Sequence, residues 1–298
     1  MVDVLKESMG IDAAPPKVSE WRRFLRVVFS RRIVIFGILI LLMLGFTAIF
    51  APWLAPYDPY KQDLRNILKH PSKAHLLGTD AIGRDTLSRV IYGSRTALIV
   101  GFVSVSISAS IGITLGLIAG YFGGIVNVII MRLTDIIMPF PMIVFALLIA
   151  SLLGGGIHNV ILALGIATVP GYIRVMCAMT LSIRENEYIL AERTMGASHI
   201  RIMLRHILPN AFAPIIVVIT LQLGFLILSE AMLSFLGIGI EPPGAAWGAM
   251  VNEGYRYLVK NPVLSFAPGA AIMLVVFAFN MVGDALRDAL DPRLKGTL

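Results

Sequence analysis

The sequence predicts an all-α integral membrane protein with about six transmembrane helices, on three observations. Hydrophobic residues make up 57% of the 298 residues and charged residues only 14%. Together with a mean hydropathy of +0.83, this composition excludes an ordinary water-soluble globule. Uncharged apolar runs of about 20 residues recur, each long enough to cross a hydrocarbon core roughly 30 Å thick. Basic residues lie between these runs and form no basic, aromatic-rich segment, so we expect the lipid bilayer as a partner and no nucleic acid.

The chain divides into an N-terminal tail, residues 1–32, and a single transmembrane domain, residues 33–298. The first apolar run is longer than the core of a signal peptide, so we expect it to remain as an anchor. Residues 1–20 are polar and are expected to be poorly ordered. The candidate spans, in order, are 33–55, 97–120, 125–153, 157–181, 210–236 and 264–286.

Residue types within and between the spans add local expectations. Proline removes a backbone donor, so we expect interruptions of the helices at Pro139, Pro141 and Pro170. The second span is rich in serine and glycine, which favours close helix packing over a polar lining. Residues 237–263 are polar and turn-rich and are expected to form a connecting loop near the lipid headgroups.

The distribution of basic residues predicts the orientation. An arginine cluster precedes the first span, which places the N-terminus in the cytoplasm, and six spans then return the C-terminus to the same side. The segment between the fourth and fifth spans is also cytoplasmic in this topology. Residues 56–96 fall outside, although their basic residues oppose the rule: Lys61, Arg65, Lys69, Lys73, Arg84, Arg89 and Arg95.

Residues 183–209, between the fourth and fifth spans, are too charged for lipid and too periodic for a loose loop. We expect two short helices, the first over about 186–195 and ending at Gly196, where glycine permits a left-handed backbone. Ser198 can cap the second helix, and Pro209 should end it. The apolar positions of the second helix fall at i, i+3, i+4 and i+7: Ile200, Met203, Leu204 and Ile207. From periodicity alone, the segment is either an interfacial helix or a docking element for a cytoplasmic partner.

Three ionisable residues lie within spans and are candidates for a polar pathway. Arg132 and Asp135 are three residues apart and share a helix face, so they can pair, either in the pathway or at the cytoplasmic rim. Glu230 follows a long apolar stretch and can face a water-filled path or a partner subunit. The single cysteine, Cys177, cannot form a disulfide within the chain.

The segment at 183–209 resembles the coupling loop of ATP-binding-cassette (ABC) importer permeases. The family motif is Glu-Ala-Ala, three residues, Gly, nine residues, Ile, one residue, then Leu-Pro. Matching positions are Ala191, Gly196, Leu208 and Pro209, and the sequence departs from the motif at Leu190, Glu192 and His206. The resemblance runs from about Trp21 and is to the "C" subunit of the oligopeptide/dipeptide permeases. Three further segments carry it: HLLGTDAIGRDTLSRVIYGSR at 75–95, GLIAGYFGG at 116–124 and AFNMVGDALRDALDPRL at 278–294.

This resemblance implies a permease like those of type I ABC importers, in a prokaryotic inner (cytoplasmic) membrane. The implied partners are a second homologous permease subunit, two ATP-binding subunits and an extracytoplasmic substrate-binding protein. The chain contains no phosphate-binding G-x-x-x-x-G-K-[ST] loop. We therefore expect a non-catalytic subunit with no cofactor or metal of its own, and ATP-Mg in the partner subunits. The residues expected to couple to the ATPases are Tyr188, Ala191, Glu192, Arg193, Gly196, Ala197 and Ser198.

Several functions stay open at this point. The resemblance implies transport of di- or oligopeptides, with nickel or another small solute as the alternative cargo. An ion-gradient-driven transporter is a rival hypothesis, although neither inverted repeats nor midplane ionisable clusters are evident. A non-transporting membrane scaffold is a third.

Overall fold

A computed structural model describes residues 29, 31–241 and 243–290. Most of the N-terminal tail and the last eight residues lie outside the described residues. The expectation that residues 1–20 are poorly ordered concerns this part of the chain. The helices are α3 (Arg32–Leu54), α4 (Thr86–Phe122), α5 (Gly124–Ile137), α6 (Met142–Leu153), α7 (Ile157–Arg184), α8 (Glu187–Thr194), α9 (His199–Arg201), the π-helix η1 (Ile202–Ile207), α10 (Leu208–Phe235), α11 (Trp247–Tyr255) and α12 (Val263–Leu290).

The described part of the chain contains five helices long and apolar enough to cross a membrane. These are α3, α4, α7, α12 and the continuous helix His199–Phe235, which joins α9, η1 and α10. The pair α5 and α6 passes the same test together and forms a sixth span if the two are counted as one. The predicted all-α membrane fold with about six spans is confirmed.

The third span, expected over 125–153, is divided into two helices. Its two halves, α5 and α6, are bent by 86° at a break that contains Pro139 and Pro141. The interruption expected at Pro139 and Pro141 is confirmed, because the helix ends before them and a new helix begins after them. The interruption expected at Pro170 is wrong, because this buried residue lies inside the continuous helix α7. Helix α7 packs along α4, and such packing lets a membrane helix tolerate an internal proline.

Two other elements are more helical than predicted. Helix α4 begins at Thr86, well before the expected start at residue 97, because the Asp85 side chain caps it by accepting a 2.8 Å hydrogen bond from the Ser88 amide. The expected loop 237–263 contains α11. Its first residue, Trp247, is buried and donates from its indole nitrogen to the Val90 carbonyl at 2.9 Å, so a tertiary contact holds this polar helix in place.

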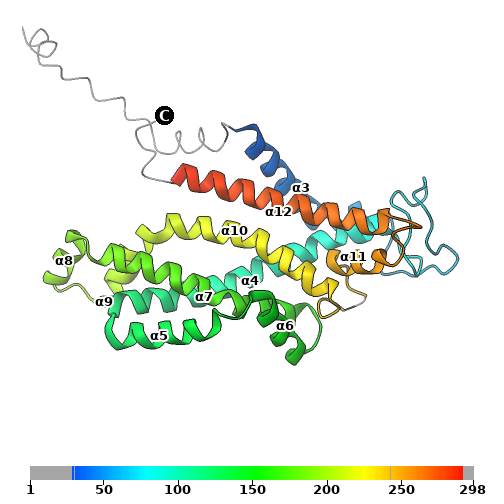
Figure 1. Ribbon diagram of the computed structural model, residues 1–298. Coiled ribbons are helices and arrows are strands. Elements are labelled where there is room, and N and C mark those ends of the chain that lie inside the picture. The colour runs from blue at the N-terminus through cyan, green and yellow to red at the C-terminus, as the bar shows by residue number, and fades with distance from the viewer. Residues whose placement is uncertain (1–28, 30, 242, 291–298) are drawn as a thin grey trace, which may run out of the picture.

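The bundle has two distinct ends (Figure 1). Helices α8 and α9 lie at one end, which we call the α8 end. Helix α11 and the loop over residues 55–85 lie at the opposite end, which we call the α11 end. Helix α3 packs on α4 and α12, while α5 and α6 flank α7. The two ends therefore present separate surfaces, joined by the long helices.

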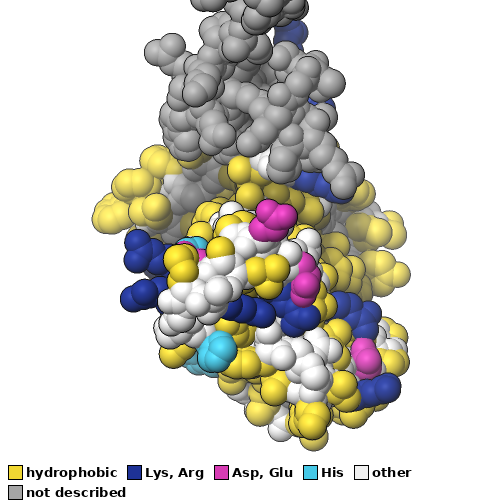
Figure 2. Space-filling view, turned by 90° about the vertical axis from the view of Figure 1, so that its left-hand side faces the viewer, with side chains coloured by type: hydrophobic (Ala, Val, Ile, Leu, Met, Phe, Trp, Pro, Cys, Tyr) yellow, Lys and Arg dark blue, Asp and Glu magenta, His cyan; other side chains and the backbone are white. Residues whose placement is uncertain are grey.

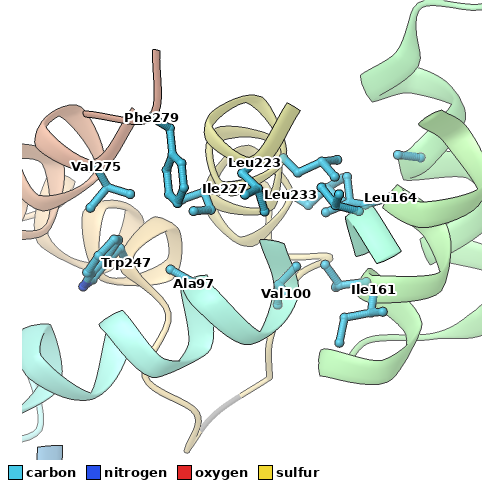
Figure 3. Close-up of a cluster of buried hydrophobic side chains, with 14 of the residues drawn as sticks. Ala97, Val100, Ile161, Leu164, Leu223, Ile227, Leu233, Trp247, Val275 and Phe279 are labelled. Carbon is cyan, nitrogen blue, oxygen red and sulfur yellow. The ribbon is translucent and has the colours of Figure 1, made fainter. Parts of the chain in front are cut away.

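The core lies between α4, α7, α10, α11 and α12 (Figure 3). Its labelled members are Ala97, Val100, Ile161, Leu164, Leu223, Ile227, Leu233, Trp247, Val275 and Phe279. Closer to the α8 end, glycines allow α4 and α7 to approach. A Cβ atom at Gly116 would lie 2.6 Å from the Ile173 carbonyl oxygen and 2.7 Å from the Met176 Cβ. The expected close packing by small residues of the second span is confirmed.

Candidate functional site

Helix α8 has the boundaries that its local sequence predicts. Met195 caps its C-terminus, and Gly196 follows with φ of 81°, in the left-handed region that glycine tolerates best. Ser198 caps the next helix by accepting a 3.4 Å hydrogen bond from the Arg201 amide. The two-helix organisation broken at Gly196 is confirmed.

A single buried side chain seats α8 on the membrane bundle. Ile189 is 0% exposed and belongs to a hydrophobic cluster that includes Tyr121 of α4, Met176 of α7 and Ile202 and Ile207 of η1. One short helix thus contacts the ends of three long ones. Movement of α8 has to displace this cluster or carry it along.

Polar and aromatic contacts hold α8 from its inner side. The Arg193 guanidinium lies 5.1 Å from the centre of the Tyr121 ring, a cation–π geometry, and the Tyr121 hydroxyl lies 2.8 Å from His199 Nδ1. Glu192 Oε1 lies 3.6 Å from His206 Nε2. Glu192 and Arg193, both expected to couple to the ATPases, therefore contact their own chain, although Arg193 is also exposed.

The outer side of α8 is an exposed, mixed surface. Met195 is 73% exposed, and a Cβ atom at Gly196 would meet no atom within 4 Å. Figure 2 views this end and shows basic side chains lying among exposed hydrophobic ones. Of the seven expected coupling residues, Glu192 and Ala197 are half-buried and the other five are exposed: Tyr188, Ala191, Arg193, Gly196 and Ser198.

The second half of the segment differs from its prediction. Pro209 does not end a separate helix: it lies in the first turn of α10, and the helix runs on from His199 to Phe235. The wider hydrogen-bonding pattern of the π-helix η1 accommodates a residue without an amide hydrogen. Of the four apolar positions expected on one face, Ile207 is buried and Met203 half-buried, whereas Ile200 and Leu204 are exposed. Ile202 is buried as well.

The ionisable residues of the spans lie in different surroundings from those expected. Asp135 pairs with Arg174 of α7 at 2.7 Å and not with Arg132, which is exposed. The cross-helix pair forms because α5 packs beside α7. Glu230 is 1% exposed, and its carboxylate accepts a 2.7 Å hydrogen bond from the Ser234 hydroxyl. The expectation that Glu230 faces an open path or a partner is not met in this conformation, because its own chain encloses it.

Sequence reasoning missed a charge cluster at the α11 end. Arg84 Nε lies 2.6 Å from Asp80 Oδ2, and Arg84 Nη2 lies 2.9 Å from Glu253 Oε2. Arg89 Nη1 lies 2.8 Å from Asp80 Oδ2. The i, i+4 spacing of Asp80 and Arg84 was a visible signal, whereas Glu253 is distant in sequence.

Solved structures with a similar fold come from an ABC transporter. Two chains from inward-facing conformations of the MetNI methionine ABC transporter superpose with TM-scores of 0.56 and 0.53 at 21% and 20% identity. The first likeness covers 69% of this chain and 97% of that chain, and the second covers 68% and 96%. The described chain therefore has the fold found in these transporter chains.

The chain belongs to the family of binding-protein-dependent transport system inner membrane components, whose family model matches residues 112–296. Residues 19–71 match the N-terminal transmembrane domain of oligopeptide transport permease C. The protein is thus a multi-pass permease subunit of an ABC importer, in the oligopeptide/dipeptide permease branch and of its C type.

Two curated relatives are similar over nearly their whole length. The glutathione transport system permease protein GsiD of Escherichia coli O6:K15:H31 (strain 536 / UPEC) is 43% identical over 277 residues, 93% of this chain and 90% of the relative. The dipeptide transport system permease protein DppC of Alkalihalophilus pseudofirmus is 41% identical over 278 residues, 93% and 91% of the two chains.

Proposed function

We propose that this subunit and a second homologous permease subunit together form the path by which an ABC importer takes up di- or oligopeptides. The single observation that carries the proposal is the 41–43% identity, over 93% of this chain, to permeases named for dipeptide and glutathione transport. Glutathione is itself a small peptide. Both relatives therefore favour a peptide cargo over nickel, which stays the alternative.

The α8 end is the coupling surface for one of two ATP-binding subunits, which hold ATP-Mg and perform the hydrolysis. Support comes from the exposed face of α8 and from the seat of Ile189 on α4, α7 and η1. Tyr188, Ala191, Gly196 and Ser198 contact the partner, while Glu192, Arg193 and Ala197 position α8. In this division of roles, the segment at 183–209 transmits movement from the ATP-binding subunit to the membrane spans and catalyses no reaction itself.

The α8 end faces the cytoplasm of a prokaryotic cell, and the α11 end faces outward to the substrate-binding protein. The contact of Arg31 with Asp288 at 3.0 Å brings the start of α3 and the end of α12 together, as an even number of spans requires. Exposed Arg193, Arg201 and Arg205 lie at or near the α8 end, which fits the preference of basic residues for the cytoplasmic side of an inner membrane.

The proposal is tested by reconstituting the complete transporter in vesicles and supplying its binding protein with a labelled dipeptide, glutathione or nickel. We expect peptide accumulation that requires ATP on the α8 side and is insensitive to ionophores. Uptake that follows an ion gradient without ATP would contradict the mechanism, and uptake of nickel alone would contradict the cargo.

A further inference from the structure

An exposed ion pair joins α5 to α7 in the body of the bundle. Arg174 Nη2 lies 2.7 Å from Asp135 Oδ1, and the two side chains are 52% and 43% exposed. The contact uses one guanidinium nitrogen and one carboxylate oxygen. Further donors of Arg174 and the second oxygen of Asp135 therefore remain available to another group.

Both charges lie well inside the length of their helices. Arg174 precedes the end of α7 at Arg184 by ten residues, and Asp135 follows the start of α5 at Gly124 by eleven. At about 1.5 Å per residue, each lies roughly 15 Å from the α8 end of its helix. Helix α7 is about 42 Å long, so a hydrocarbon layer roughly 30 Å thick includes this level. Ionised groups at such depth face water-filled cavities or protein, not lipid.

An open cavity of about 220 Å³ adjoins the pair at the bend between α5 and α6. Met138 and Gly171 line it. Met138 follows Asp135 by three residues and Gly171 precedes Arg174 by three, so each shares a helix face with its ion-pair residue. The rest of the lining is mostly apolar, with the Gln222 side chain as a polar group, while the buried Thr168 hydroxyl donates to the Leu164 carbonyl. The pair and the cavity therefore lie next to each other along one strip of the bundle, charged at the pair and mostly apolar at the cavity.

We propose that Asp135 and Arg174 are a transient binding site for the two charged termini of a peptide in the path between the permease subunits. This inference rests on the proposed function. A free peptide carries an ammonium group and a carboxylate, so it can exchange with the pair: Asp135 binds the ammonium group and Arg174 binds the carboxylate. Every charge keeps a counter-charge during the exchange, which avoids an unpaired ion at membrane depth. The adjoining cavity gives room for peptide side chains.

The first test asks whether this strip meets water. Cys177 is the single cysteine and is buried, so a C177A background accepts single-cysteine variants. In the complete transporter in membranes, we expect a charged, membrane-impermeant thiol reagent to modify R174C. The matched control is M43C, which is also exposed on the isolated chain but lies on the apolar α3; it should not react. An R174C as unreactive as M43C would overturn the proposal.

The second test measures transport. We expect D135N and R174Q each to lower uptake of a zwitterionic dipeptide by about tenfold, the effect of losing one hydrogen bond to a charged group. Complex assembly and ATP hydrolysis should persist. The exposed Arg95 supplies the matched control, R95Q, which should transport normally. Unchanged uptake by both pair variants would overturn this inference alone, whereas failure of the wild-type transporter to take up any peptide would overturn the proposed function.

Discussion

Arg89, at the start of α4, donates a 2.7 Å hydrogen bond to Glu253 of α11, 164 residues further along the chain. The same nitrogen donates to Asp80 at 2.8 Å, and the arginine is 2% exposed. A buried guanidinium shared by two carboxylates fixes the loop before α4 against α11. The surface at the α11 end is therefore assembled by tertiary ion pairs.

Removing this guanidinium should destabilise the α11 end. We expect R89Q to lower the free energy of unfolding by about 3 kcal/mol, the lower end of the cost of breaking a buried ion pair, because Arg84 still contacts both carboxylates. Thermal unfolding of the detergent-solubilised complex measures the loss. The comparison is R95Q, which removes an exposed arginine of the same helix; equal melting temperatures for the two variants would refute the structural role of Arg89.

The close approach of α4 and α7 should not tolerate a large side chain. We expect G116L to cost several kcal/mol, on the order of the overpacking penalty or more, because even its Cβ would lie 2.6 Å from the Ile173 carbonyl oxygen. The yield and melting temperature of the purified subunit report this loss. Ser110, exposed on the same helix, is the matched site: S110L should express and melt like the wild type. A stable G116L would mean that the two helices are not packed as described.

The seat of α8 should depend on one side chain. Ile189 is buried and Leu190 beside it is exposed, so I189A leaves a cavity that costs about 2 kcal/mol or more, while L190A does not. We expect amide hydrogen exchange in α8 to accelerate by at least about tenfold in I189A. Equal exchange in the two alanine variants would show that Ile189 does not hold the helix.

Coupling should depend on the left-handed backbone conformation at Gly196. There is room around this position, and its φ of 81° suits asparagine far better than a β-branched residue. With the function proposed above, we expect G196V to hydrolyse ATP while uptake falls by about tenfold, a change equivalent to about 1.4 kcal/mol. Under the same conditions, G196N should transport close to normally. Normal uptake by G196V would remove this segment from the coupling mechanism.

Features of the fold set by short stretches of sequence were predictable. Apolar length is enough to locate a span, and a glycine and a serine two residues apart, Gly196 and Ser198, set the turn between α8 and α9. Such signals act within a few residues, so they survive in any tertiary context.

Features that depend on contacts between distant segments were not predictable from one sequence. Pro209 looked like a helix end because the π-helical turn before it left no sign in the sequence. Asp135 was matched to Arg132 on its own helix because its partner, Arg174, belongs to another. Residues 247–255 looked like a loop because the buried contact of Trp247 with α4 is what stabilises them as a helix.

The helix from His199 to Phe235 is continuous, so its two ends can move together as one rigid body. Its 37 residues span roughly 55 Å, and at the far end Asn252 of α11 donates to the Phe235 carbonyl. With the function proposed above, a displacement of the chain beside Ser198 would move the α11 end of this helix as well, because the helix between them is continuous.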